Sequence, residues 1–519
     1  MKKFLFLNQN TSQLAAGMNG SQKNLPEGML RSLLRSSSLY FLYALPYLFI
    51  FLFSIYLPYD ADLGWHLKYG EYFFKHGHVL YDNNFSRMMP EFKWANTSWG
   101  IDVISYAAFH LGNFQGLSIL SAAIVTLTFF FFSKAFKLTL WSQTILFPIF
   151  MFLLQPINEV SMRGQQVSLL FLGILFYLLT KISIKDQWNW ILIPILFLFW
   201  VNIHGEFILG LAILSAWAGI KFLVDLRSKD ERNIKGQIFF WGRIVILSAV
   251  LTFVNPFGMS LYGQEVFAHI GAKELKSIAE YLPFSDLSSE WRANVVIFCL
   301  VLIGAMYLYF SDKLIPNLPF LGVTLLLAFL TFSVKRYAWP YYYTSLLFVA
   351  PFLDLFQPGK KWEARISAVL LVIILCVTFY YKNPIASLKN MSWETYCNTY
   401  IQCSKESAKF LVDHKLQNTN LFTVYNWGGY IIWNYPEIKP LIDGRMHLWK
   451  DKKGYSAFDE YYPVEQNLKD IDKTSYKTAY VLRSKPVYDR LYELAKEEKW
   501  RLVYVDDKAG IFVRNESNP

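Results

Sequence analysis

The stretch YLPYDADLGWHLKYG, residues 56–70, begins at the end of an apolar run, 39–58, that is long enough to cross a lipid bilayer as a helix. It carries Asp60, Asp62 and His66 just past the point where that helix would leave the hydrocarbon. Ionisable side chains at a membrane edge are costly, and they usually have a partner or a function. The fold and the candidate site therefore both depend on which other segments of the chain place residues at this membrane edge.

Apolar segments of similar length recur along most of the chain. The 519 residues are 54% hydrophobic and 18% aromatic, and only 17% are charged, which is typical of a membrane protein. The sequence predicts a polytopic α-helical membrane protein with about eleven transmembrane helices. We place these spans at 39–58, 114–133, 138–157, 164–180, 187–203, 207–224, 238–257, 293–310, 316–334, 337–353 and 366–381.

The net charge of +11 is concentrated in the N-terminal segment and in short connections between the spans. These basic residues all fall on one side if the spans alternate: Lys2, Lys3, Lys23, Arg31, Arg35, Lys134, Lys137, Lys181, Lys185, Arg227, Lys229, Arg232, Lys235, Lys360, Lys361 and Arg365. By the positive-inside rule that side is the cytoplasm. This orienting bias accounts for the charge, so we expect membrane lipids, and no nucleic acid, as partners.

Three parts follow from this topology. Residues 1–38 form a cytoplasmic N-terminal segment, 39–382 a transmembrane domain, and 383–519 a polar C-terminal domain. With an odd number of spans and the N-terminus inside, the C-terminal domain is extracytoplasmic. The first apolar run is long and lacks a small-residue cleavage site, so we interpret it as a retained span rather than a signal peptide.

Two long connections, 59–113 and 258–292, lie on the outer side, where binding and catalytic residues are usually found. In the first, DLGWHLKYGEYFFKHG has apolar residues at helical spacing and predicts an amphipathic helix at the interface. WGIDVISYAAFHLG, 99–112, is apolar but short and contains Asp102, so we interpret it as a second interfacial or re-entrant helix. Counting it as a span would reverse every later segment and put the basic connections outside.

The C-terminal domain alternates strand-like and helix-like stretches, which predicts a small α/β layer structure. We expect strands at NLFTVYN, KPLID, KTAYVL, WRLVYVDD and AGIFVR, a turn and short helix at WGGYIIWNYPE, and a helix at VYDRLYELAKEE. Cys397 and Cys403 lie in this domain, and whether they form a disulfide stays open, whereas Cys299 and Cys376 lie within apolar spans.

Charged and histidine side chains also stand at three other outer edges of the spans. They are Glu159 and Arg163, His204 and Glu206, and Lys335 and Arg336. Acids and cations gathered at one interface fit a site for a phosphorylated, membrane-bound substrate, in which cations bind the phosphate and an acid handles a proton. Structural alternatives stay open: contact of Lys335 and Arg336 with lipid head groups, a local pair of Arg163 with Glu159, and a packed loop position for His204.

Several short motifs occur in the same order in a known enzyme family. They are DADLGWHLKYG, DNNFS (82–86) and WANTSWGID (94–102) in the first loop, followed by RGQQVSLLFL, NIHGEFILG, NPFG and YNWGGYIIWNYPEIKPLIDGR. The chain resembles the C-type integral-membrane glycosyltransferases, which use polyprenyl-phosphate-linked sugars and include the protein O-mannosyltransferases and the lipid A aminoarabinose transferases. The pattern is similar to that of a largely uncharacterised bacterial branch. Gly164 stands where the family usually has proline, between Arg163 and Gln165.

The resemblance implies a hexosyl- or pentosyltransferase that is a multi-pass protein of the bacterial inner (plasma) membrane. It implies sugar transfer from a polyprenyl-phosphate donor to a cell-envelope glycan, lipid or protein at the outer face. The first-loop carboxylate of the family activates the acceptor hydroxyl, and the matching position is Asp60. The candidate substrate-binding residues are Asp62, His66, Arg163, His204, Lys335 and Arg336, with the cations holding the leaving phosphate. Some relatives need a divalent metal and others do not, so the cofactor stays unknown.

The alternative function is a non-catalytic carrier or flippase for a lipid-linked glycan. Such a protein is expected to place ionisable residues near the bilayer midplane and often contains inverted repeats. Here they stand at one rim, and the sequence contains no evident repeat, which favours the enzyme. Two interpretations also stay open for Asp443 and Arg445 in IDGRMHLW: a tight turn with an internal ion pair, or a contact with sugar or acceptor, to which Trp427 and Tyr430 would add stacking.

Overall fold

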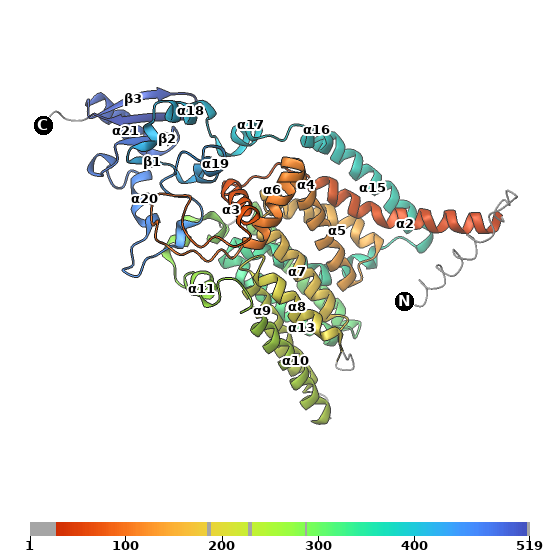
Figure 1. Ribbon diagram of the computed structural model, residues 1–519. Coiled ribbons are helices and arrows are strands. Elements are labelled where there is room, and N and C mark those ends of the chain that lie inside the picture. Colours follow the sequence, from red (N-terminus) through yellow and green to blue (C-terminus); the bar gives the residue numbers. More distant parts are fainter. Residues whose placement is uncertain (1–26, 184–187, 227–230, 286–287, 516–519) are drawn as a thin grey trace, which may run out of the picture. The chain divides into compact units, whose positions relative to one another are not determined.

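The computed structural model describes residues 27–183, 188–226, 231–285 and 288–515. The chain forms two compact units, 1–45 and 46–519, and helix α2 (Glu27–Phe53) crosses from one to the other. The second unit contains both the apolar helices and the C-terminal sheet (Figure 1). The predicted domain boundaries at 38 and 382 stay predictions.

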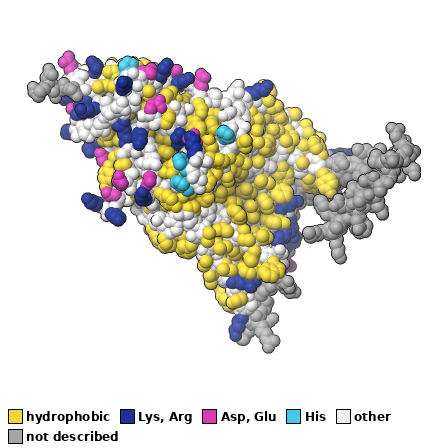
Figure 2. Space-filling view, viewed as in Figure 1, with side chains coloured by type: hydrophobic (Ala, Val, Ile, Leu, Met, Phe, Trp, Pro, Cys, Tyr) yellow, Lys and Arg dark blue, Asp and Glu magenta, His cyan; other side chains and the backbone are white. Residues whose placement is uncertain are grey.

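The body of the second unit is a set of apolar helices (Figure 1). Figure 2 shows hydrophobic side chains over most of its visible face, while charged side chains gather over the C-terminal part. The helices are α4 (Trp99–Phe136), α5 (Leu140–Leu153), α6 (Gln155–Val160), α7 (Gly164–Leu179), α8 (Leu192–Val201), α9 (Phe207–Asp225), α10 (Glu231–Leu251), α12 (Ser289–Phe310), α13 (Leu314–Ser333), α14 (Ala338–Leu353) and α15 (Lys360–Lys382), with short α11 (Met259–Tyr262), α16 (Pro384–Lys389) and α17 (Trp393–Tyr396) in the connections.

Six helices among the described residues are long and apolar enough to cross a membrane: Trp99–Phe136, Phe207–Asp225, Ile234–Leu251, Ser289–Phe310, Leu314–Ser333 and Trp362–Lys389. Shorter apolar helices at Tyr40–Phe53, Leu140–Leu153, Gly164–Leu179 and Asn189–Val201 coincide with four further predicted spans. The polytopic helical class is thus confirmed in its coarse form. The number of eleven spans stays a prediction.

The first outer loop contains both predicted helices. Helix α3 (Leu63–His76) ends at Gly77, which adopts the left-handed conformation with φ of 72°. Helix α4 is broken at Gly112 and Asn113, whose backbone angles are not helical, so its first part is separate from the segment that matches the predicted span 114–133. The position of these two loop helices at the membrane interface stays a prediction.

The C-terminal sheet has the strand order β1-β2-β4-β3. Strand β1 (Leu421–Thr423) pairs in parallel with β2 (Thr478–Leu482), and β4 (Ala509–Arg514) pairs antiparallel with both β2 and β3 (Trp500–Val505). All five residues of β2 are buried, which explains its uninterrupted apolar run. Helices α18 (Lys405–Asp413), α19 (Gly428–Asn434), α20 (Ala457–Glu465) and α21 (Pro486–Lys496) accompany the sheet, so the predicted α/β class is observed.

One predicted strand, KPLID at 439–443, is wrong, because this segment has no strand structure. The backbone groups of this segment form hydrogen bonds with the first loop and with a side chain rather than with a neighbouring strand. The carbonyls of Pro440 and Leu441 accept hydrogen bonds from the first loop at Arg87 and Met88 (3.0 and 3.2 Å), and the amide of Leu441 donates to Thr423 Oγ1 (2.8 Å). Proline has no amide hydrogen to donate to a sheet. The segment therefore joins the C-terminal part to the first loop.

The C-terminal part packs closely on helix α3, which lies beside α19 (Figure 1). A Cβ atom built on Gly64 would lie 1.8 Å from the carbonyl oxygen of Gly429. No side chain larger than hydrogen fits at such a distance, so glycine is required on the α3 side of this contact. The segment that carries Asp60 and Asp62 directly precedes α3 and is held by the same contact.

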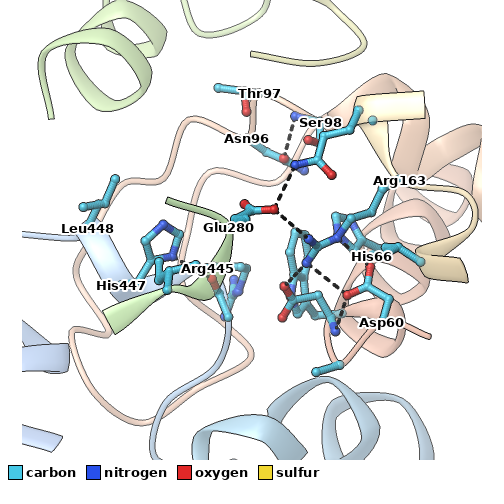
Figure 3. A pocket seen from close by; sticks show the side chains of 18 of the residues that line it. Asp60, His66, Asn96, Thr97, Ser98, Arg163, Glu280, Arg445, His447 and Leu448 are labelled. Carbon is cyan, nitrogen blue, oxygen red and sulfur yellow. Dashed lines mark hydrogen bonds and ion pairs between the residues drawn. The ribbon is translucent and has the colours of Figure 1, made fainter. Parts of the chain in front are cut away.

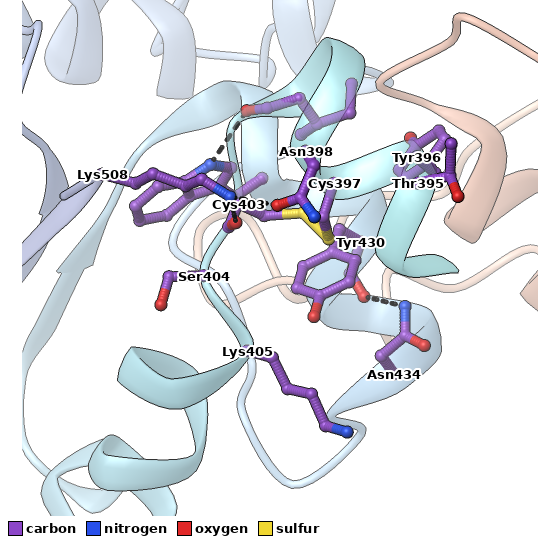
Figure 4. Close-up of a disulfide and its surroundings, with 12 residues drawn as sticks. Thr395, Tyr396, Cys397, Asn398, Cys403, Ser404, Lys405, Tyr430, Asn434 and Lys508 are labelled. Carbon is purple, nitrogen blue, oxygen red and sulfur yellow. Dashed lines mark hydrogen bonds between the residues drawn. A yellow bond between two sulfur atoms is a disulfide. The ribbon is translucent and has the colours of Figure 1, made fainter. Parts of the chain in front are cut away.

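A disulfide between Cys397 and Cys403 closes the start of the C-terminal part (Figure 4). Tyr396, next to Cys397, donates its hydroxyl hydrogen to the backbone carbonyl of Asp60 (2.5 Å). The sequence left open whether Cys397 and Cys403 form a disulfide, and in the structure they do. Cys299 and Cys376 are free thiols, exposed on α12 and α15.

Replacing Gly64 by alanine should loosen the contact between α3 and α19. The added methyl group must displace the Gly429 backbone, and overpacking of this kind costs about 1–3 kcal/mol. Thermal unfolding of the purified protein in detergent measures the loss. Gly263→Ala is the matched control, because Gly263 has helical backbone angles and an added Cβ would touch nothing within 4 Å. Equal melting temperatures for the two variants would contradict the proposed packing.

Thiol labelling tests the disulfide directly. In denaturing detergent without reductant, maleimide should modify Cys299 and Cys376 only, and after reduction it should modify all four cysteines of the chain. Mass spectrometry of the peptides reads out the positions. Modification of Cys397 or Cys403 before reduction would show that the pair is not formed.

Candidate active site

A cavity of about 610 Å³ lies where the first loop, the second outer loop and the C-terminal part meet the ends of the apolar helices. Figure 3 shows a close view of it. Segments far apart in sequence supply its lining: the residues before α3, the start of α7, the turn after α8, the short helices η4 (Ala279–Tyr281) and η5 (Lys335–Tyr337), and 444–449. Six of the seven predicted site residues line it: Asp60, Asp62, His66, Arg163, His204 and Arg336.

Arg163 lies at the centre of this cavity, immediately before α7. Its guanidinium donates from Nε to Asp60 Oδ2 (3.0 Å) and from Nη2 to Asp60 Oδ1 (3.1 Å) and Asp62 Oδ2 (3.0 Å). Its Nη1 lies 4.0 Å from Glu280 Oε2. A planar guanidinium can hold several carboxylates in fixed directions, which an ammonium cannot. Arg163 therefore ties the first loop to the second outer loop, and its alternative pair with Glu159 is not formed.

Arg336 continues the network on the other side of Glu280. It donates from Nε to Glu206 Oε1 (2.8 Å) and from Nη1 to Glu280 Oε1 (2.8 Å) and to the hydroxyl of Tyr281 (2.9 Å). Glu280 thus lies between the two guanidiniums, and Gln165 donates to its second oxygen (3.2 Å). The result is a continuous charged chain across the cavity.

The charges in this chain shift one another's pKa values. Burial lowers the pKa of Arg163, but Asp60, Asp62 and Glu280 outweigh burial and raise it. Loss of water contact raises the pKa of Glu280, but the two guanidiniums outweigh it, so the pKa of Glu280 is lowered. Burial and the nearby charge of Asp60 raise the pKa of Asp62. Two guanidiniums and four carboxylates thus make up the charged chain.

His66, in the first turn of α3, meets Asp102, in the first turn of α4. Its Nδ1 lies 2.5 Å from Asp102 Oδ1, and Asn96 donates to the other oxygen of that carboxylate (2.6 Å). Asp102 is fully buried, whereas the side chain of His66 keeps 15% of its surface exposed. Burial lowers the pKa of His66, but Asp102, Asp60 and Asp62 outweigh burial and raise it.

His204, in the turn after α8, also lines the cavity and lies in a packed position. Its Nδ1 shares a hydrogen bond with Ser168 Oγ (3.0 Å), and Trp200 donates to that same hydroxyl (2.9 Å). Burial and the charges of Arg336 and Arg163 lower its pKa well below 6.5, so His204 is neutral at physiological pH. A Cβ atom at Gly164 would lie 2.3 Å from His204 Cδ2, which gives a steric reason why glycine replaces proline at this position.

Lys335 is the one predicted site residue outside the cavity lining. Its ammonium lies over the ring of Phe284, 5.7 Å from the ring centre, while the neighbouring Arg336 turns into the cavity. In the short helix η5 these two adjacent side chains point in different directions. The structure thus separates two adjacent cations, both of which the sequence-based prediction places in the site.

The outer wall of the cavity comes from the C-terminal part and from 92–98 of the first loop. Asp443 and Arg445 form a buried pair (2.7 Å), so the tight turn with an internal ion pair is the interpretation observed. Arg445 turns its guanidinium toward Trp94 and Trp449 (4.9 and 5.2 Å to the ring centres), and both rings line the cavity.

Two other aromatic candidates are unavailable to a ligand. Trp427 is fully buried against Tyr480, with 4.5 Å between the ring centres, and Tyr430 keeps only 4% of its surface exposed. Neither residue lines the cavity. The predicted stacking on a sugar therefore does not fit this arrangement.

Several cavity residues were missed by the sequence-based prediction, above all Glu280. The length of the second outer loop was the available signal. That loop and the helix after it also contain Glu274, which pairs with Lys450 (2.7 Å), and Glu290, in the first turn of α12. Nothing in the local sequence indicates that Glu280, rather than Glu274 or Glu290, would line the cavity. His447, whose pKa burial lowers to about 4, likewise lines the cavity without a sequence signal.

A resident metal ion would need a suitable set of ligands. Among the described residues, no group of three or more histidine, cysteine, aspartate or glutamate side chains is placed to hold one. Asp60 and Asp62, the two carboxylates considered as metal ligands, are both engaged by Arg163. The observed side chains therefore build an ion-pair network at this position.

Comparison with known proteins shows the class of fold. No protein-family model matches the chain, and no curated protein matches its sequence. The fold is similar to that of the oligosaccharyltransferase of Archaeoglobus fulgidus in its apo crystal structure, with a TM-score of 0.55 and 11% sequence identity over 84% of this chain and 69% of that one. The chain therefore shares the fold of that oligosaccharyltransferase.

Removing the central guanidinium should destabilise the protein. Arg163→Met leaves three carboxylates without their common partner, and we expect a loss of roughly 3 kcal/mol, the lower end for breaking a buried pair, because Arg163 keeps 27% exposure. The loss should shrink as pH falls toward 4, since protonation removes the repulsion between the acids. Thermal unfolding between pH 4 and 8 measures this dependence. Arg292→Met, at an exposed position, is the control, and a loss that does not vary with pH would contradict the electrostatic role.

Proposed function

We propose that this protein is a membrane glycosyltransferase that transfers a sugar from a polyprenyl-phosphate-linked donor to a cell-envelope acceptor. The observation that carries the proposal is the convergence of Asp60, Asp62, His66, Arg163, His204 and Arg336 in one cavity at the helix ends, within a fold similar to that of an oligosaccharyltransferase. The neighbour in question transfers oligosaccharides, as its name states. The motif resemblance described above supports a bacterial branch of the C-type superfamily.

The reaction needs a base for the acceptor and positive groups for the leaving phosphate. We assign the base to Asp60, which takes the proton as the acceptor oxygen attacks the anomeric carbon. The lipid phosphate departs as a stable anion and is held by Arg163 and Arg336. Arg163 Nη1, 4.0 Å from Glu280, is beyond hydrogen-bonding distance and is available to a phosphate oxygen. The guanidiniums can therefore bind phosphate without releasing the carboxylates.

The site is proposed to lie at the outer face of a bacterial inner membrane, with the N-terminus in the cytoplasm and the C-terminal part outside. Two observations support this orientation. Basic connections gather on the other side of the spans, and the disulfide between Cys397 and Cys403 is of a kind that persists in oxidising compartments. Hexose or pentose donors, and glycan, lipid or protein acceptors, all fit this location.

A carrier or flippase for lipid-linked glycans is the rival function. It is expected to hold its substrate near the bilayer midplane. The charged chain through Arg163 and Arg336 lies instead where helices begin and end, directly before α7 and α14. This placement favours chemistry at a membrane surface.

Asp60→Asn should abolish sugar transfer. The amide has nearly the same shape but cannot accept the acceptor's proton, and general bases contribute about 10²–10⁴-fold to rates. Purified protein in nanodiscs is supplied with a panel of synthetic polyprenyl-phosphate hexoses and pentoses and with cell-envelope glycans, and product is detected by mass spectrometry. Asp82→Asn is the matched control, since Asp82 lies in the same loop and pairs with Lys93 away from the cavity. Undiminished transfer by Asp60→Asn would exclude Asp60 as the base.

A further inference from the structure

His66 and Asp102 form a pair that the proposed reaction does not yet use. Each belongs to the first turn of a different helix, α3 and α4, and the two helices pack against each other. The carboxylate of Asp102 is 0% exposed and has two partners, His66 Nδ1 at 2.5 Å and Asn96 Nδ2 at 2.6 Å. Asn96 is itself buried. The carboxylate is therefore fixed in orientation and directed at the imidazole.

This geometry determines which nitrogen of His66 carries the proton. An ionised carboxylate can only accept hydrogen bonds, so Nδ1 of His66 is the donor toward Asp102. Nε2 is then the acceptor nitrogen of the neutral ring. The side chain lines the cavity, and the ring of Trp65 stacks on it with 3.6 Å between the ring centres. A neutral imidazole with a free lone pair is thereby held at the wall beside Asp60 (Figure 3).

Asp60, by contrast, has both oxygens engaged. Oδ1 accepts from the backbone amide of Asp62 (3.0 Å) and from Arg163, and Oδ2 accepts from Arg163. Its side chain is 4% exposed. A proton that arrives on Asp60 displaces one of these hydrogen bonds and has little contact with water. A second acceptor close by is needed to take the proton onward.

We propose that His66, oriented by Asp102, is the proton acceptor that relieves Asp60 during transfer. This inference rests on the proposed glycosyltransferase activity. The acceptor hydroxyl gives its proton to Asp60 while its oxygen bonds to the anomeric carbon, and the bond from that carbon to the phosphate oxygen breaks with its electron pair on the phosphate. The proton then passes from Asp60 to Nε2 of His66 and leaves to water as the imidazolium deprotonates.

The charges around His66 suit a transient imidazolium. Asp60 and Asp62 face it from the segment before α3, and Asp102 faces it from α4, all of them negative. His204, which also lines the cavity, is neutral, and the charge of Arg163 is already shared by carboxylates. Three negative neighbours stabilise the positive ring. His66 is therefore placed to receive the proton from Asp60.

The first test follows activity against pH. Below its own pKa, His66 is already protonated and cannot accept, so transfer should fall as pH drops through that pKa, which lies above 6.5. His66→Gln should lower the rate by about 10²-fold and remove this acid limb. Asp102→Asn should keep a residual rate and move the limb to lower pH, because the carboxylate that raises the pKa of His66 is lost. His76→Gln, on the same helix with an exposed side chain and no charged partner, should behave as wild type.

A second test needs no sugar donor. Diethyl pyrocarbonate reacts with neutral imidazole nitrogens. The whole purified protein is treated and then digested, and mass spectrometry of the peptides reports His66 and His76 separately. Modification of His66 should show a pH midpoint above the ordinary value for a histidine, because the surrounding carboxylates raise its pKa. In Asp102→Asn the His66 midpoint should fall, while that of His76 stays unchanged. A midpoint for His66 that is unaffected by Asp102→Asn would overturn the pairing.

The outcomes separate this inference from the proposed function. If wild type transfers sugar, Asp60→Asn is inactive and His66→Gln retains the full rate and acid limb, the relay is wrong and the function stands. A second outcome is that no form of the protein transfers sugar, while the pH midpoint for pyrocarbonate modification of His66 falls in Asp102→Asn. In that case the pairing of His66 with Asp102 stands and the transferase proposal fails. The relay is supported if His66→Gln loses activity with an unchanged melting temperature, and if Asp102→Asn lowers both the pH of the acid limb and the pH midpoint for modification of His66.

Discussion

The ion pairs made by the guanidinium of Arg163 are the interactions on which the cavity at the helix ends depends. Asp60 and Asp62 from the first loop and Glu280 from the second would repel one another if they were brought together without a cation. A planar, permanently charged group with five donors can satisfy such a cluster in fixed geometry. Arg336 extends the same solution to Glu206. The cavity can exist because these two guanidiniums hold loops from distant parts of the chain.

The C-terminal part belongs to this site structurally. It closes the outer wall with Arg445 and reaches the first loop through the tight contact at Gly64 and the hydrogen bond from Tyr396 to Asp60. A change in the sheet or in the disulfide-closed segment is therefore transmitted to the carboxylates through a few rigid contacts.

Much of the fold could be predicted, because local patterns determine it. Apolar runs mark the helices, alternation of short strands and helices marks the C-terminal sheet, and both predicted helices of the first loop form. The strand predicted at 439–443 is wrong. Its apolar residues suggested a strand, but Pro440 has no amide hydrogen to donate, and the carbonyls of Pro440 and Leu441 accept hydrogen bonds from the first loop instead. Strand formation depends on an available partner strand, which a local reading does not reveal.

By itself, the sequence determined the helical membrane class, the α/β character of the C-terminal part and the gathering of Asp60, Arg163 and Arg336 at one face, because hydrophobicity and topology act along the chain. Only the tertiary structure decided which groups meet. It selected Arg336 over Lys335, brought Glu280 between the guanidiniums and paired His66 with Asp102. Side-chain direction and contacts across loops depend on packing in three dimensions, which neither composition nor spacing specifies.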